Sequence, residues 1–296
     1  MKVKCDKECL LNGIQVVYST TTLKSTLPIL SNILIETQKD RIKLTATDLD
    51  IGITNDFAVR VEMEGAVTIP AKRFFDIIKE IPQDKEITIS AKKNNIVTIE
   101  CENLFFKLIG LPKEEFPRLP EFKDRDSIVI KQQVLKKMLT MTAFAMSYDQ
   151  TRYVLNGSLF AIGPEGFRVV STDGRRLAMI QGQVHAPKDF ENAPKNIIVP
   201  AKAIFELLRT LGSGDDVKIV ISENQVLFNL GSTTIVSRLI EGEFPMYEQV
   251  IPKELKDNLK VNRESLFLAV KRASILTSQE SQAIKLELFK DKLVIS

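Results

Sequence analysis

The residues that could carry out chemistry are few, and none is placed for catalysis. The single histidine, His185, stands in the stretch QVHAPKD, which has the composition of a loop. A histidine that acts as a general base needs a partner acid or a nucleophile within reach, and none is evident in the sequence. The glycine patterns of phosphate loops and dinucleotide-binding turns do not occur either. These observations favour a binding protein over an enzyme, and we expect no catalytic residue.

Metal-binding and export patterns are equally weak. Cys5 and Cys9 form a C-x3-C pair, but no second pair of ligands follows, so we expect no metal and no cofactor. Cys101 makes the number of cysteines odd, which favours a reducing cytoplasm. Asp48 and Asp50 follow a predicted strand, where a turn is their expected role. The charged start MKVKCDKE does not resemble a secretion signal, and no apolar run approaches the roughly 18 residues of a membrane span. We therefore predict a cytoplasmic protein that makes no membrane contact.

Basic residues gather on the predicted helices. The helices expected over 6–19, 71–81, 131–147, 201–211 and 263–276 carry a net charge of +6, and the rest of the chain carries −3. A basic helical layer suits a polyanion that is held through its phosphates without reading of base sequence. An ordinary solvated helix face is the alternative for any one helix, but four of the five have the same sign. The helical candidates for phosphate contact are Lys72, Arg73, Lys136, Lys137, Lys202 and Arg209.

The chain repeats itself at a lag of 130 residues. The stretch VPAKAIFELLRTL begins at Val199, and IPAKRFFDIIKEI begins at Ile69. Each is followed by short alternating segments that predict strands, as in EITIS and VKIVIS. Strand runs punctuated by single helices predict α+β domains with helices on one face of antiparallel sheets. The repeats predict domains at 1–122 and 123–252 and an incomplete third at 253–296, with joints that open on Glu-Phe-Pro at Glu115 and Glu243. A duplication without a shared purpose is the alternative to a ring or an array.

Several stretches resemble a known family as a set. They are LPILSNILIE at 27–36, TRYVLNGSLF at 151–160, STDGRRLA at 171–178, VPAKAIFELLRTLG at 199–212 and EGEFPMYEQVIP at 241–252. Together they are similar to the bacterial DNA sliding clamps, the beta subunits of DNA polymerase III, along the whole chain. The resemblance implies the DNA clamp fold, a ring of two head-to-tail protomers with three similar domains each. Helices would line a hole around double-stranded DNA, and the protein would be a non-enzymatic processivity factor for the replicative DNA polymerase.

The resemblance also implies particular sites. On the DNA side it adds Lys24, Arg152 and Tyr153, although the chain has Asp149 and Val154 where the family often has Gln and a second aromatic residue. An apolar groove beside the second joint would take short hydrophobic peptides from the polymerase, the clamp loader and repair proteins. The matching groove positions are Leu155, Thr172, Gly174, Arg175, Arg176, Leu177, Pro245 and Val250. Leu155 and Leu177 could instead be plain core residues, and Asp173-Gly174 a tight turn.

Ring closure is implied at one further pair of segments. Phe106 and Leu108 of the first domain would pack against Ile275 and Leu276 of a second copy. The third repeat begins near 253 and stops at 296, far short of the repeat length, so we expect a weaker dimer and a weaker groove than in a complete clamp. Two rival functions stay open, an enzyme with an unrecognised site and a linear nucleic-acid-binding array that does not close.

Overall fold

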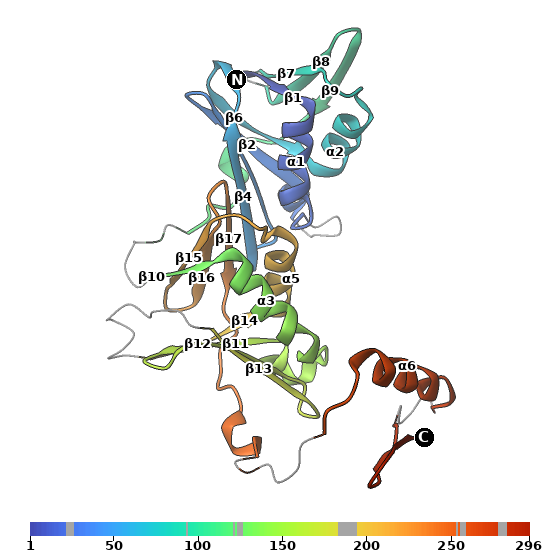
Figure 1. Cartoon of the computed structure of the whole chain (residues 1–296). Coiled ribbons are helices and arrows are strands. Elements are labelled where there is room, and N and C mark those ends of the chain that lie inside the picture. The colour runs from blue at the N-terminus through green and yellow to red at the C-terminus, as the bar shows by residue number, and fades with distance from the viewer. Residues whose placement is uncertain are drawn as a thin grey trace. The chain divides into compact units, whose positions relative to one another are not determined.

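The computed structural model describes residues 1–21, 27–92, 94–120, 122, 127–182, 194–252, 254, 259–277 and 283–296. They form two compact units, Met1–Pro245 and Met246–Ser296, and each is described by itself (Figure 1). Within the described residues no helix has both the length and the apolar character needed to cross a membrane.

The first half of the larger unit contains nine strands and two α-helices. In chain order they are β1 (Lys2–Asp6), α1 (Lys7–Tyr18), β2 (Asn32–Gln38), β3 (Arg41–Thr47), β4 (Ile51–Ala58), β5 (Arg60–Met63), β6 (Gly65–Pro70), α2 (Ala71–Glu80), β7 (Glu86–Ala91), β8 (Ile96–Cys101) and β9 (Leu104–Ile109). Two short 3-10 helices, η1 (Pro28–Ser31) and η2 (Lys113–Glu115), stand before β2 and after β9.

The second half repeats this plan. Its elements are β10 (Ser127–Lys131), α3 (Gln132–Thr142), η3 (Ala143–Ala145), η4 (Gln150–Leu155), β11 (Gly157–Gly163), β12 (Gly166–Thr172), β13 (Leu177–Gly182), β14 (Lys195–Pro200), α5 (Ala201–Thr210), β15 (Asp216–Ile221), β16 (Gln225–Asn229) and β17 (Thr233–Arg238). The repeat lag in the sequence is therefore a repeat in the fold.

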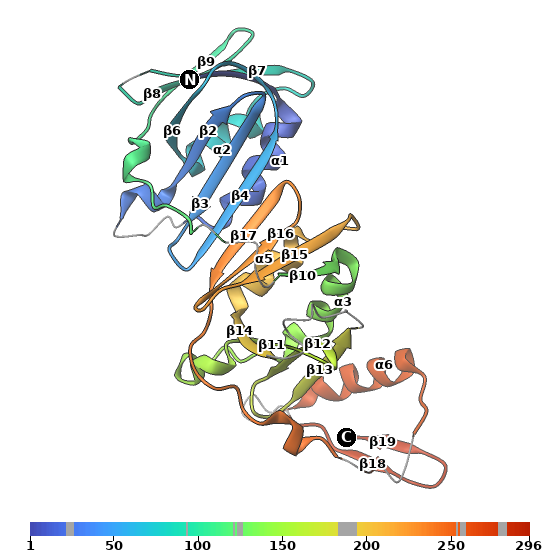
Figure 2. The ribbon, with the colours of Figure 1, turned by 90° about the vertical axis from the view of Figure 1, so that its left-hand side faces the viewer.

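A single sheet joins the two halves. The five-stranded sheet has the order β5-β1-β7-β8-β9, and the four-stranded sheet has the order β13-β12-β11-β14. Between them the eight-stranded sheet runs β10-β15-β16-β17-β4-β3-β2-β6, so β17 of the second half pairs with β4 of the first. That pairing is antiparallel and sets Ile235 opposite Ile53. Figure 2 shows this sheet from its open side, and Figure 1 shows α1, α2, α3 and α5 along the other side.

The helices form where apolar residues recur at helical spacing. On α1, Leu10, Ile14 and Val17 are fully buried, and Asp6 caps the first turn by accepting from the amide of Glu8. On α2 and α5, a proline just before the first turn supplies the fixed φ that a helix start tolerates. These buried faces and the inner faces of the sheets make one continuous apolar core through both halves.

The structure confirms the predicted fold class and all five predicted helices, each within a few residues of its expected ends. It adds strands that the sequence analysis did not predict, β1, β5, β6, β10 and β14. The domain boundaries at 122 and 252 stay a prediction.

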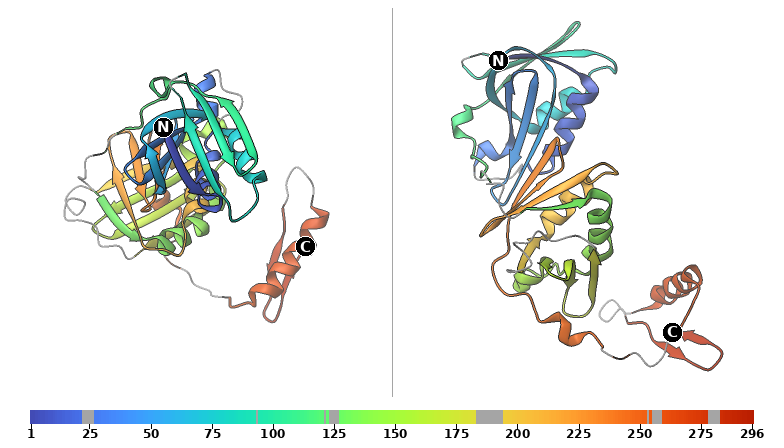
Figure 3. Two further views of the ribbon diagram at one scale, coloured as in Figure 1. Left: turned by 90° about the horizontal axis from the view of Figure 1, so that it is seen from above. Right: turned by 60° about the vertical axis from the view of Figure 1, so that its left-hand side comes forward.

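The smaller unit consists of a helix and a hairpin, preceded by η5 (Tyr247–Val250). Asn262 caps α6 (Arg263–Ala273), and η6 (Ser274–Leu276) follows it directly. The strands β18 (Leu286–Leu288) and β19 (Leu293–Ile295) pair antiparallel. Figure 3 shows α6 and the hairpin in two views. Large apolar side chains of this unit, such as Phe267 and Leu276, are exposed, so its described residues bury little apolar surface by themselves.

Candidate nucleic-acid interface and peptide groove

Three of the predicted phosphate contacts are exposed side chains that are free to bind. Lys72 and Arg73 lie on the first turn of α2, and Lys137 lies on α3. Among the described residues none of the three makes an ion pair or a side-chain hydrogen bond. They lie on the helical side of the unit, where the sequence placed the basic layer (Figure 1). A mobile, unpaired cation is what a non-specific phosphate contact requires.

Three other predicted contacts have structural partners instead. Lys136 donates from Nζ to the carbonyl of Leu211 at the end of α5, where a cation is favoured by the helix dipole. Lys202 forms an ion pair with Asp48 in the turn between β3 and β4. Arg209 is the most heavily used, and its contacts hold the two halves of the unit together. Each of these three cations thus already has a structural partner, and the assignment of Lys136, Lys202 and Arg209 as DNA contacts stays a prediction.

Arg209 closes the C-terminal end of α1 from the neighbouring helix α5. Its Nη1 donates to the carbonyl of Gln15 at 2.9 Å, and its Nη2 donates to the carbonyl of Val16 at 2.7 Å. The same guanidinium contacts Ser19 Oγ and pairs with Glu206, whose carboxylate accepts from Ser19. A planar five-donor group can serve several acceptors at once, which a lysine cannot. Arg209 thus joins the helices of the two halves as β17 and β4 join their sheets.

The remaining DNA-side predictions lie near the second repeat's turn or outside the described residues. Arg152 belongs to η4, and its Nη1 donates to the carbonyl of Asp173 at 3.4 Å. Tyr153 is 56% exposed beside Gly242, which has a positive φ of 124°. Lys24 lies outside the described residues, as does His185.

The turn between β12 and β13 is built by one aspartate. Asp173 Oδ1 accepts from the amides of Arg175 and Arg176, at 2.9 and 3.0 Å. Thr172 Oγ1 donates to the carbonyl of Arg176 and accepts from the amide of Gly174. Gly174 has a φ of 84°, which favours glycine. Thr172 and Gly174 to Arg176 are thereby brought into one turn, where the side chains of Arg175 and Arg176 are exposed and that of Arg176 pairs with Asp173.

Hydrogen bonds keep the Asp173 carboxylate of this turn ionised. Burial opposes the charge of Asp173, but the amides of Arg175 and Arg176 and the Arg176 guanidinium outweigh it and lower the pKa of that carboxyl. Asp149, just before η4, has its pKa lowered chiefly by hydrogen bonds from Thr151. Both carboxylates therefore stay charged at neutral pH.

The apolar groove residues divide between the two units. Leu155, at the end of η4, is buried, and Leu177, which pairs with Thr172, is half-buried. Pro245 is exposed at the end of the larger unit. Val250 is 70% exposed in the smaller unit, and its place beside the groove stays a prediction.

The sequence indicated a tight turn at Asp173-Gly174, and the structure has one, but one residue of this region, Phe144, was missed. Asp173 organises the turn through side-chain-to-backbone hydrogen bonds, which the Thr-Asp-Gly order suits. Phe144, in η3, is 57% exposed, and the Arg176 guanidinium lies 5.6 Å from the centre of its ring. An exposed aromatic stacked by an arginine is a natural wall for an apolar groove. Its sequence signal was hidden inside the run TAFAMS, which looks like the end of a buried helix.

The predicted ring contacts differ in how much surface they offer. Among the described strands, β9 stands at the edge of its sheet and pairs with β8 alone. Phe106 is half-buried, whereas Leu108 is 7% exposed and already belongs to the core. Leu108 therefore has little surface left to bury, and its assignment as a ring contact stays a prediction. Phe105 and Ile109, on the other face of β9, are widely exposed, as are Ile275 at 76% and Leu276 at 90%.

Metal chemistry finds no support in the part of the chain that the structure describes. There, no group of three or more His, Cys, Asp or Glu side chains could hold a metal ion. Cys5 is buried, and that burial raises the pKa of its thiol to about 12. A thiol of this kind is inert at neutral pH.

Repeated α+β domains joined through one sheet, with unpaired cations on the helical side, define a clamp-type DNA-binding protein. The family described as "DNA polymerase III beta subunit, N-terminal domain" matches residues 1–120, and "DNA polymerase III beta subunit, central domain" matches residues 129–246. The chain belongs to the beta sliding clamp family. It is 31% identical to the beta sliding clamps of Chlamydia pneumoniae and Escherichia coli K12, over 100% of this chain and 80% of each relative.

Solved structures agree with this assignment. A sliding clamp from Pseudomonas aeruginosa, bound to griselimycin, superposes with a TM-score of 0.93 at 31% identity, over 100% of this chain and 79% of that one. A DNA polymerase sliding clamp from Bacillus subtilis gives a TM-score of 0.93 at 29% identity, over 100% of this chain and 80% of that one. The resemblance inferred from the sequence is confirmed, and so is the expected class of function.

Proposed function

We propose that this chain is a ring-forming processivity factor that encircles double-stranded DNA and tethers the replicative DNA polymerase. The observation that carries the proposal is the match of the whole chain to beta sliding clamps in both sequence and fold. An accessory role without catalysis follows from that family, and the scattered titratable residues support it.

Contact with DNA should be loose and independent of base sequence. Lys72 and Arg73 share the first turn of α2 and Lys137 lies on α3, and exposed cations of this kind contact phosphates, which carry no base information. Affinity from so few phosphate contacts is low and falls steeply with salt. Topological closure, rather than tight binding, would then keep the protein on DNA while letting it slide.

Partner proteins would bind through the groove at the β12–β13 turn. A short peptide with Gln and two large apolar side chains would place the apolar ones over Leu155 and Leu177. Arg176 would hold a peptide carbonyl, because a guanidinium offers several donors in a fixed plane. The polymerase, the clamp loader and repair proteins are the expected carriers of such peptides.

Closure would use the free edge of β9 and the exposed apolar side chains after α6. Within the chain, β17 is the edge strand of the second repeat, and it pairs with β4 at the edge of the first repeat. The same kind of pairing, between β9 and a second copy, would give a head-to-tail homodimer.

Topology is the decisive test of this function. The protein is loaded by a clamp loader onto a nicked circular plasmid and separated from free protein by gel filtration in about 0.5 M salt, where loose phosphate contacts are screened. We expect it to stay on the circle and to be lost once a restriction enzyme cuts the DNA. Retention on the linear product would favour a linear array instead. Turnover of the loader's nucleotide by the clamp alone would favour an enzyme.

A further inference from the structure

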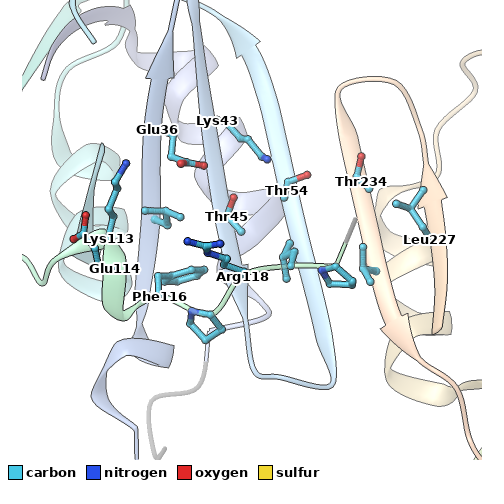
Figure 4. Close-up of a pocket in the computed structure, with 15 residues that line it drawn as sticks. Glu36, Lys43, Thr45, Thr54, Lys113, Glu114, Phe116, Arg118, Leu227 and Thr234 are labelled. Carbon is cyan, nitrogen blue, oxygen red and sulfur yellow. The ribbon is translucent and has the colours of Figure 1, made fainter. Parts of the chain in front are cut away.

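A cavity of about 650 Å³ lies on the outer side of the eight-stranded sheet, where the two halves of the larger unit meet. Its wall is the segment Lys113–Pro120, here called the strap, which comprises η2 and the start of the first joint and crosses the sheet (Figure 4). Its floor comes from β2, β3 and β4 of the first half and from β16 and β17 of the second half. None of the residues assigned above to DNA, groove or ring closure lines this cavity.

The cavity occupies the same position in the first repeat as the predicted peptide groove occupies in the second repeat. Both lie beside a joint that opens on Glu-Phe-Pro. The turn between β3 and β4 also copies the groove's turn bond for bond. Thr47 Oγ1 donates to the carbonyl of Ile51 and accepts from the amide of Leu49, and Asp48 Oδ1 accepts from two amides, as Thr172 and Asp173 do. A concave surface at this place is therefore a repeated feature of the fold.

The apolar floor is different in the first repeat. Gly52 pairs with Thr47 in the register that Leu177 has with Thr172. A Cβ on Gly52 would lie 2.4 Å from Leu119 Cδ2, so the strap's Leu119 fills the space above it. Phe116 is likewise buried in a small cluster with Ile29, Leu30 and Leu34. The strap thus occupies this end, and the open part of the cavity lies further along the strands.

Polar groups line that open part. Thr45, Thr54 and Thr234 are cross-strand neighbours, so they form one row that runs over the junction between the two halves. Thr45 is 4% exposed, and its Oγ1 has no hydrogen-bond partner in the described part of the chain. Buried hydroxyls are seldom left unpaired, and their partner is a protein group or an ordered water.

The charges at the rim favour one anionic group. Lys43 faces Glu36 across the strands, and Lys113 stands next to Glu114 in the strap, so each lysine has an acid nearby. Arg118 lines the same cavity, and among the described residues it makes no ion pair (Figure 4). It is the group that a ligand carboxylate would satisfy.

We propose that this cavity is a second docking site for an extended partner peptide, which places a large apolar side chain against Leu227 and Val236 and an acidic side chain on Arg118. The peptide backbone would run along Thr54 and Thr234, the two members of the threonine row that are only half-buried. The inference rests on the proposed function only in that clamp partners would bring the peptide.

The site can be mapped with a minimal probe, acetyl-Leu-Asp-Phe-amide, titrated into the whole chain labelled on leucine and valine methyl groups. We expect NMR shifts at Leu34, Leu227 and Val236. They should persist in Leu177→Ala, which damages only the predicted groove. They should vanish in Thr54→Phe, which fills the centre of the row. Thr98→Phe, on β8 of the five-stranded sheet, is the matched control and should leave them intact.

Charge recognition is tested with the amide version of the probe, acetyl-Leu-Asn-Phe-amide. It should bind the wild type about threefold more weakly, as for a partly exposed ion pair. Arg118→Gln should bind both probes equally, and Arg118→Lys should keep part of the difference. Equal binding of both probes by the wild type would overturn the role of Arg118.

The outcomes separate this site from the groove. Shifts confined to Leu155 and Leu177 would support the groove and overturn the second site. Shifts confined to the cavity would support the second site, and shifts at neither place would overturn it. Shifts that survive Thr54→Phe would show that the probe lies elsewhere on the surface, which also overturns the inference.

Discussion

Arg209 shows how much the role of one cation depends on residues far away in the sequence. Its charge and its place on a helix predicted a phosphate contact. Its partners, Gln15 and Val16, are more than 190 residues away and convert it into a helix cap. Lys202 is similar, since Asp48 is 154 residues away. Composition and periodicity predict which residues are basic and helical, but they carry no information about such long-range contacts. The structure is therefore needed to separate structural cations from free ones.

Removing Arg209 should destabilise the protein rather than weaken DNA binding. The substitution Arg209→Ala should lower the free energy of unfolding by about 1–2 kcal/mol, because it leaves two carbonyls at the end of α1 without their charged donor. The figure is kept modest because the side chain is 41% exposed. Urea unfolding measures it. Arg41→Ala, which breaks an exposed pair with Asp56, is the control and should cost less than about 0.5 kcal/mol. An effect no larger than that of the control would refute the capping role.

Of the two neighbouring lysines predicted to contact DNA, Lys136 and Lys137, we expect Lys137 to make the contact. Lys137→Gln should reduce the slope of log affinity against log salt by about 0.9, the value for one phosphate contact. Lys136→Gln should change the slope less, because Lys136 already serves the end of α5. Fluorescence anisotropy with a short duplex at several salt concentrations measures both. Lys43→Gln, on the outer side of the sheet, is the control. Equal slopes for Lys137→Gln and the wild type would mean that α3 does not face DNA.

Leu177 should matter to peptide binding and to nothing else. Leu177→Ala removes apolar surface from the centre of the predicted groove, so affinity for a peptide with two large apolar side chains should fall about tenfold. Calorimetry with such a peptide measures the loss, and the anisotropy assay should show unchanged DNA binding. Met179→Ala removes an exposed apolar side chain from the same strand and serves as the control. An undiminished affinity would place the groove elsewhere.

At the scale of elements, the sequence predicted the helices and strands whose apolar residues recur at regular spacing. The helices and most strands were found because their buried faces recur at regular spacing, as on α1 and β16. β1 was missed because the lysines of KVKCD mask the inward alternation of Val3 and Cys5. β6 and β14 were missed because each runs directly into a helix through a proline, which looks like a helix start rather than a strand end. The candidate groove was predicted as a set of residues, whereas the hydrogen bonds that shape its turn were not.

The turn at Asp173 should open at low pH. Its folded-state pKa lies below the usual 3.8, so ionisation stabilises the turn above about pH 4, and that contribution is lost as the pH falls through the folded pKa. NMR shifts of the Arg175 and Arg176 amides should be constant from pH 8 to 5 and change only below about pH 4. Asp173→Asn should remove that change, since an amide does not titrate. A midpoint well above pH 4 would show that the carboxylate is not stabilised in the fold.

At the scale of the whole molecule, the pairing of strands between the two halves indicates how two copies of the chain could pair. β17 joins β4 across the two halves, and Ile235, which pairs with the core residue Phe228, is fully buried there. Phe106 occupies the matching place on β9, paired with the core residue Ile99, but it has no neighbouring sheet to cover it. The strand edge is thus covered by a neighbouring strand at β17, between the two halves, and is uncovered at β9, at the far end of the first half. An open edge strand with apolar side chains is an assembly surface or a hazard.

Self-association should therefore depend on Phe106 and on the exposed pair after α6. Burying one such side chain contributes about 1.5–3 kcal/mol, so Phe106→Ala or Leu276→Ala should raise the dimer dissociation constant by about tenfold or more. Analytical ultracentrifugation over a range of concentrations measures it. Met63→Ala is the matched control, because Met63 is 61% exposed on β5 at the opposite edge of the same sheet. If Met63→Ala weakens the dimer as much as Phe106→Ala does, the head-to-tail geometry is wrong, since β9 would then hold no special place in the contact.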